Sequence, residues 1–240
     1  MTTFFYQNEP WISPQQLLEF LRSGEVGEWW VDGLGPLVVR GEARLGRLLI
    51  AHGAGAGQDS VFLEQLRHAL AEAGVQTLAM EFAYLQQMRR EARRRPPPRI
   101  DRLVDELARW CDTVSHNDLP PLWVGGKSMG GRAASLLTAR DAAAGLVLCG
   151  YPFHPAGKPD TLRLSHWPLI GCPTIVVQGT RDPFGNQDEV SGYSLPDGVA
   201  LHWLEDGDHD WKPRRSSGRV QLDLIQEGAE AIASFMARMS

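Results

Sequence analysis

Short apolar runs alternate with helical patterns along most of this sequence, and many of the runs end at glycine. Examples are GRLLIAHG at 46–53, QTLAMEF at 76–82 and GLVLCG at 145–150. A continuous apolar run of this length is typical of a strand that is buried on both faces, as in a parallel sheet. The alternation therefore predicts an α/β fold, with a mostly parallel sheet and helices on both of its faces.

The same alternation of predicted strands and helices continues over the rest of the chain. Further strands are predicted at 28–32, 36–40, 122–126, 174–179 and 199–205, and helices at 60–73, 99–114, 129–139 and 220–239. We interpret residues 1–27 as an extension with one short helix, and residues 28–240 as a single domain, an ordinary size for this fold class. Only about two dozen residues separate 145–150 from 174–179, which leaves no room for a large cap domain.

Composition excludes several classes of protein. The formal net charge of −5 gives no global basic field, so nucleic acid is not an expected partner. No apolar run approaches the length of about 18 residues that a membrane span needs, and the N-terminus lacks a signal-peptide pattern. Three cysteines at no metal-like spacing favour a reducing compartment, so we expect a cytoplasmic protein without a metal site.

The stretch WVGGKSMGGRAAS at 123–135 contains the pattern G-x-S-x-G, formed by Gly126, Ser128 and Gly130. It lies between a predicted strand and a predicted helix, at the carboxyl end of the strand, where α/β sheets bind ligands. A sharp turn of this kind needs small neighbours and presents the hydroxyl at a helix N-terminus, which favours developing negative charge. The pattern indicates a nucleophile, with a plain glycine-rich turn as the alternative.

Candidates for the base and its orienting acid follow in the chain order Ser, Asp, His. Asp182 comes just after the strand predicted at 174–179, and His209 comes after the one at 199–205. Asp182 precedes proline, so a turn residue is its alternative role. His209 lies among aspartates, so a solvated loop histidine remains possible, and a metal site is disfavoured because no second histidine lies at ligand spacing.

An acyl-transfer site also needs two backbone N–H groups that point at one oxygen. We expect them from Met129, which follows the serine, and from Ala54 in the glycine loop HGAGAG at 52–57. A phosphate-binding turn is the alternative for this loop. It lacks both the G-x-G-x-x-G spacing and the G-K-S/T ending that such turns carry.

Five segments together resemble one family: AHGAGAGQDS, GGKSMGGR, GYPFHPAGKP, QGTRDPFG and DGDHDWKPR. They are similar to the α/β-hydrolase superfamily over about residues 46–239. The nearest likeness is to a small cap-less branch related to dienelactone hydrolase, which includes hydrolase-like domains of a chromatin-complex subunit and of a testis-expressed protein. The resemblance implies an α/β-hydrolase fold, the triad Ser128, Asp182 and His209, and oxyanion donors at Ala54 and Met129.

Side chains near the strand ends suggest what the pocket prefers. We expect apolar and stacking contacts with substrate from Tyr151, Phe153, His154 and Trp167. The chain has 21 arginines and three lysines, and Lys127, Lys158 and Lys212 all lie in segments predicted at the strand ends. Three consecutive prolines at 96–98 predict that the arginine-rich stretch around 89–99 is an exposed loop. Together with this stretch the lysines form a hypothetical rim for anionic esters, with Lys127 in contact with substrate, although a solvated arginine face is the simpler interpretation.

The sequence thus predicts a serine hydrolase that acts on a small ester or thioester through an acyl-enzyme, without a metal or an organic cofactor. The alternative is a hydrolase-like domain that binds a partner without turnover. An acyltransferase would use the same residues. The sequence does not define the substrate or the oligomeric state.

Overall fold

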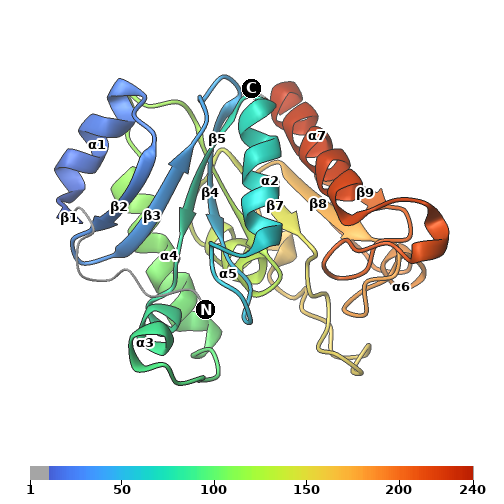
Figure 1. Cartoon of the computed structure of the whole chain (residues 1–240). Coiled ribbons are helices and arrows are strands. Elements are labelled where there is room, and N and C mark those ends of the chain that lie inside the picture. The colour runs from blue at the N-terminus through green and yellow to red at the C-terminus, as the bar shows by residue number, and fades with distance from the viewer. Residues whose placement is uncertain (1–10, 240) are drawn as a thin grey trace.

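The computed structural model describes residues 11–239 and consists of one sheet between two layers of helices (Figure 1). The strands are β1 (Trp11–Ile12), β2 (Gly27–Val31), β3 (Gly35–Arg40), β4 (Gly46–Ala51), β5 (Val75–Met80), β6 (Leu122–Lys127), β7 (Gly145–Cys149), β8 (Thr174–Gly179) and β9 (Val199–Leu204). The helices are α1 (Pro14–Ser23), α2 (Val61–Glu72), α3 (Ala83–Glu91), α4 (Ile100–Val114), α5 (Met129–Thr138), α6 (Gln187–Ser191) and α7 (Gln221–Met239).

The sheet has the strand order β1-β2-β3-β5-β4-β6-β7-β8-β9. From β5 to β9 every neighbouring pair is parallel, while β3 is antiparallel to both β2 and β5. The predicted α/β class with a mostly parallel sheet is therefore confirmed. Because parallel strands share a direction, the loops that follow β4, β6, β8 and β9 all leave the sheet at one edge.

The two faces of the sheet are buried by different helices. On one face α2 and α7 pack beside each other, and on the other α4 lies between α1 and α5 (Figure 1). Strand β4 shows why its residues form a continuous apolar run: Leu49 packs into one core, while Leu48 and Ile50 pack into the other. A strand covered on both sides has no polar face.

The N-terminal segment is integrated into the fold as far as it is described. Strand β1 pairs in parallel with β2, so it covers that edge of the sheet, and Leu17 and Leu21 of α1 are buried in the core. Helix α1 begins with a capping box between Ser13 and Gln16 and ends at Gly24, whose φ is 75°. Residues 1–10 of the predicted extension lie outside the described residues.

Between β7 and β8, residues 150–173 form loops and one short 3₁₀ helix (Trp167–Leu169), so no cap domain is inserted there. The arginine-rich stretch differs from the prediction of a loop around 89–99. Its first residues complete α3, which ends where Ala92 adopts a left-handed conformation with φ 49°. The loop is confined to 92–99, which contains the three prolines that cannot continue a helix.

Candidate functional site

The turn between β6 and α5 holds Ser128 in a strained conformation. Its φ is 53° and its ψ is −113°, a region that costs a residue with a side chain about 1–3 kcal/mol. The flanking glycines are required sterically. A Cβ on Gly126 would lie 2.5 Å from the carbonyl carbon of Gly130, and a Cβ on Gly130 would lie 2.4 Å from the Ala51 oxygen. The G-x-S-x-G pattern is therefore the sequence of a turn that no bulkier residues can form.

Ser128, His209 and Asp182 form one hydrogen-bonded chain. The Ser128 Oγ lies 2.9 Å from His209 Nε2, and His209 Nδ1 lies 2.8 Å from Asp182 Oδ2. Asp182 is fully buried, and its other oxygen accepts the backbone N–H of Phe184 at 2.9 Å. Since an ionised carboxylate only accepts, Nδ1 carries the proton and Nε2 is left to accept the Ser128 hydroxyl.

The loop that carries His209 is braced from several sides. Asp206 accepts hydrogen bonds from the Arg214 backbone at 2.6 Å and forms an ion pair with Arg181 at 2.9 Å. The strand ends also meet closely, because a Cβ on Gly179 would lie 2.3 Å from the Gly207 oxygen. These contacts hold the loop in place, so they fix the position of the His209 imidazole relative to the Asp182 carboxylate.

The glycine loop after β4 runs directly past the serine. A Cβ built on Gly53 would lie 3.8 Å from the Ser128 Cβ. Within residues 11–239, neither the Ala54 nor the Met129 backbone N–H donates to a protein acceptor. The Ala54 carbonyl is held from the other side by the Tyr84 hydroxyl at 3.1 Å. The two predicted oxyanion donors are thus unengaged N–H groups at the first residue of α5 and on the loop beside it.

Two residues at the site were not singled out from the sequence. His52 is buried beneath the glycine loop, where its Nε2 accepts the Phe82 N–H at 3.0 Å and its Nδ1 lies 2.7 Å from the Gly53 oxygen. Burial lowers the pKa of His52 to about 4, so the ring is neutral and its Nδ1–H donates to Gly53. Phe184 places its ring 4.5 Å from that of His209. The sequence contained a signal for both residues, because His52 is the first residue of the glycine loop and Phe184 follows Asp182 by two residues.

The four expected substrate contacts are core residues instead, and that expectation needs correction. Tyr151 and Phe153 are fully buried, Trp167 is 1% exposed and His154 is 2% exposed. The three aromatic rings pack on one another, with centroids 5.0–5.7 Å apart. They offer no surface to a substrate because the short segment between β7 and β8 uses them to fasten itself to the sheet.

Lys127 also differs from its predicted role. Its side chain is buried beneath the turn, with Nζ 3.5 Å from Asp210 Oδ1 and 5.5 Å from the centre of the Phe62 ring. Burial lowers the pKa of this amine, against the opposing effect of Asp210. As the last residue of β6 it points toward the loop that carries His209, so it supports that loop rather than a substrate.

The expected anionic-ester rim is not assembled. Arg89 pairs with Asp59 at 2.8 Å and with the buried Glu81 at 2.8 Å, and Arg95 and Arg99 pair with acidic neighbours. The remaining side chains of the hypothetical rim are exposed: Arg90, Arg93, Arg94, Lys158 and Lys212. The stretch is mainly a solvated and internally paired face, which was the simpler interpretation.

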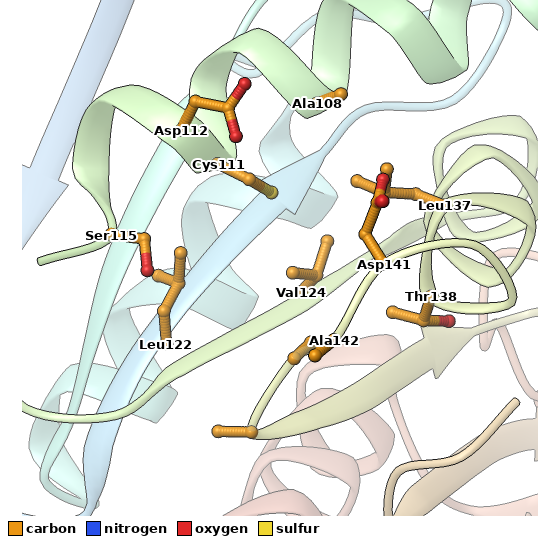
Figure 2. A pocket seen from close by; sticks show the side chains of 12 residues that line it. Ala108, Cys111, Asp112, Ser115, Leu122, Val124, Leu137, Thr138, Asp141 and Ala142 are labelled. Atoms are coloured by element: carbon orange, nitrogen blue, oxygen red, sulfur yellow. The ribbon is translucent and has the colours of Figure 1, made fainter.

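A cavity of about 270 Å³ lies at the other end of the sheet (Figure 2). It is lined by Leu122 and Val124 near the start of β6 and by Cys111 of α4, whose sulfur points inward. Ser128 follows the opposite end of β6, so this cavity is separate from the candidate site. Among residues 11–239 no group of three His, Cys, Asp or Glu residues is arranged to hold a metal, and no helix has the length and hydropathy of a membrane span.

Comparison with known families gives one match. The model of an alpha/beta hydrolase domain matches residues 44–237, from β4 to all but the last two residues of α7, and this range contains Ser128, Asp182 and His209. No curated protein matches the sequence.

Many solved structures share the fold at low sequence identity. Dienelactone hydrolase from Anabaena variabilis is 20% identical, with a TM-score of 0.66 over 89% of this chain and 98% of that one. XC6422 from Xanthomonas campestris, described as an a/b serine hydrolase without lid, is 20% identical with a TM-score of 0.59 over 87% and 95%. Est1E from Butyrivibrio proteoclasticus is 13% identical with a TM-score of 0.66 over 89% and 99%. At these identities the likeness concerns the fold.

Proposed function

Because this chain belongs to the alpha/beta hydrolase family, we propose that it is a serine hydrolase that cleaves small ester-like substrates, carboxylic esters or thioesters, through an acyl-enzyme. One observation carries the proposal. The strained Ser128 places its Oγ 2.9 Å from His209 Nε2, and the buried Asp182 holds the other ring nitrogen at 2.8 Å. A plain glycine-rich turn has no physical reason to meet a histidine oriented in this way.

In the proposed reaction the Ser128 Oγ attacks the substrate carbonyl carbon while its proton passes to His209 Nε2. The carbonyl electron pair moves to oxygen, where the N–H groups of Met129 and Ala54 stabilise the negative charge. Asp182 stabilises the imidazolium that forms but keeps its own charge. When the intermediate collapses, His209 returns the proton to the leaving alcohol or thiol, and Ser128 is acylated.

Deacylation repeats these steps with water. His209 removes a proton from the water as it attacks the acyl carbon, and the same N–H groups of Ala54 and Met129 stabilise the second oxyanion. The proton then returns to Ser128 Oγ, which releases the acid. Two further residues keep the loops of the site in position. His52 holds the Gly53 carbonyl, and Asp206 holds the loop that bears the histidine.

The test is intact-mass analysis after exposure to a fluorophosphonate, with Ser128→Ala and His209→Ala in parallel. The expected result is one adduct on the wild type, none on Ser128→Ala, and an adduct that forms at least about 100-fold more slowly on His209→Ala. Hydrolysis of 4-nitrophenyl acetate should follow the same order. A folded wild-type protein that takes no adduct would contradict the proposal and favour a hydrolase-like domain that only binds a partner.

A further inference from the structure

Two arginines, one on α5 and one in the segment between β7 and β8, lack an acidic partner among the described residues. Arg132 lies one turn after Ser128 on α5, and its backbone N–H donates to the Ser128 oxygen at 2.9 Å. Arg163 lies in the segment between β7 and β8. Both are half-buried, and within residues 11–239 neither forms an ion pair with a carboxylate. Arg89, Arg181 and Arg214, in contrast, each pair with an aspartate.

The Arg132 guanidinium is the more unusual of the two. Its Nε is buried and has no hydrogen-bond partner among the described residues. A buried donor without an acceptor costs free energy, and a charged one costs more than a neutral one. Helical side chains tilt toward the helix N-terminus, so the Arg132 side chain projects toward the end of α5 that follows Ser128. The charge therefore lies toward the end of α5 nearest Ser128.

A hydrogen-bond network fixes the segment that bears Arg163 against α5. The Tyr151 hydroxyl donates to the Arg163 oxygen at 2.9 Å and accepts the indole N–H of Trp167 at 3.2 Å. His166 in the same segment lies with its Nε2 2.8 Å from Ser135 Oγ, and that hydroxyl in turn donates to the Arg132 oxygen at 2.9 Å. These bonds link the backbone of Arg163 to that of Arg132 through Tyr151 and Ser135.

Among the described residues, no carboxylate pairs with the positive charges of Arg132 and Arg163. Burial lowers the pKa of Arg163, and the positive charge of Arg132 lowers it further. Burial, followed by the same charge, lowers the pKa of His166 to about 4, so His166 is neutral at neutral pH. Two guanidinium groups that interact in this way without a carboxylate repel each other, unlike Arg89 and Arg214, which are paired. An anion placed between them would relieve that repulsion.

Resting on the hydrolase function proposed above, we infer that Arg132 and Arg163 form a subsite for a carboxylate or phosphate carried by the substrate, so that the preferred substrates are anionic esters. The planar guanidinium binds such groups through two parallel hydrogen bonds. Arg132 is close enough to Ser128 for one small molecule to present its anionic group here and its ester carbonyl at the serine. The buried Tyr151 and Trp167 act as supports for this subsite rather than as contacts.

Two matched pairs of esters test the inference. In the first pair, 4-nitrophenyl hemiglutarate carries the charge on the acyl side and 4-nitrophenyl hexanoate is neutral. In the second, 4-acetoxyphenyl phosphate carries it on the alcohol side and phenyl acetate is neutral. In Arg132→Gln, the ratio of kcat/KM for the charged ester to that for its neutral counterpart should fall about 10- to 100-fold in at least one pair, through a higher KM.

The matched control is Arg94→Gln, which removes the same charge from the exposed 92–99 loop and should leave both ratios unchanged. Arg132→Lys, which keeps the charge but loses the planar fork, should recover only part of the ratio. If Arg132→Gln changes the charged and neutral esters of both pairs by the same factor, the inference is wrong. An equal fall of the ratio in Arg94→Gln would overturn it as well, since a general field would then explain the preference.

Binding without turnover separates this inference from the hydrolase proposal. Calorimetry with glutarate and with inorganic phosphate on Ser128→Ala, compared with the double variant that adds Arg132→Gln, needs no reaction. The subsite predicts that the second substitution weakens binding of one of these anions at least about tenfold. Equal binding by the two proteins refutes the subsite whether or not the wild type hydrolyses esters. A wild type that hydrolyses none of the four esters, while this difference persists, refutes the hydrolase proposal alone.

Discussion

Replacing Ser128 by glycine should stabilise the protein while it removes the proposed nucleophile. Ser128 is held at φ 53° and ψ −113°, a conformation that costs about 1–3 kcal/mol in a residue with a Cβ and almost nothing in glycine. Glycine loses about 0.5–1 kcal/mol more backbone entropy on folding than alanine does. The difference predicts that Ser128→Gly unfolds with a free energy about 1 kcal/mol higher than Ser128→Ala, the variant that keeps the Cβ.

Thermal and urea unfolding of the two variants measures this difference. In a chain of 240 residues, 1 kcal/mol corresponds to a shift in Tm of about 2–4 °C. Ser115 provides the matched control, because it is exposed and adopts an ordinary conformation with φ −90° and ψ 122°. There the order should reverse, with Ser115→Gly less stable than Ser115→Ala. If Ser128→Gly is no more stable than Ser128→Ala, the turn does not store strain and the reasoning from its dihedral angles is wrong.

Two further predictions concern the groups around the turn. Gly130→Ala should lose several kcal/mol of stability or fail to fold, because its Cβ would meet the Ala51 oxygen at 2.4 Å, whereas Gly55→Ala, with open space around it, should unfold at nearly the wild-type urea concentration. His52 binds its proton at a lower pH in the folded than in the unfolded chain, so stability should fall as the pH drops from about 6.5 to about 4, by at most about 3 kcal/mol from this group, and no further below that range. Unfolding of the wild type in that window takes up about one proton at His52, and His52→Gln lacks this uptake, so its unfolding free energy should depend less steeply on pH. An unchanged slope would mean that the ring titrates normally.

Much of the fold and the hydrogen-bonded arrangement of Ser128, His209 and Asp182 were predictable from the sequence because both depend on the backbone. Strands β4, β6 and β8 are buried on both faces, so their apolar runs are continuous and visible. Residues that directly follow parallel strands come to one edge of the sheet wherever the helices lie. Ser128, Asp182 and His209 are such residues, so their order along the chain was enough to place them together.

The elements that were missed lack a periodic signal of their own. Strand β1 is two residues long and exists only because β2 offers it an edge. Helix α3 is short, polar and rich in arginine, and tertiary contacts hold it in place. Among these are the ion pairs of Arg89 with Asp59 and Glu81. Partners 8 or 30 residues distant in sequence cannot be assigned from local propensity, so the stretch was expected to be a loop.

Side chains that reach away from the backbone were the hardest to place. Tyr151 and Lys127 lie at or just after strand ends, as Ser128 does, yet both side chains are buried in the protein. The direction of each side chain depends on its surroundings. Tyr151 packs into the aromatic core under the 150–173 segment, and Lys127 forms an ion pair with the carboxylate of Asp210. Position at the edge of a sheet therefore predicts proximity to a site, but not contact with what the site binds.

The arginines show the same distinction in terms of charge. A count of 21 arginines pointed to the stretch where they are densest, and most of the positive charge there is paired or solvated. Electrostatic work at a site depends on charges that are partly buried and uncompensated, and density along the sequence does not measure either property. Arg132 and Arg163 are isolated in the sequence, 31 positions apart, and their segments are linked by hydrogen bonds of Tyr151 and His166. For this chain, the carboxylates in ion pairs identify which arginines are already engaged, and the partly buried, unpaired Arg132 and Arg163 are the ones to test.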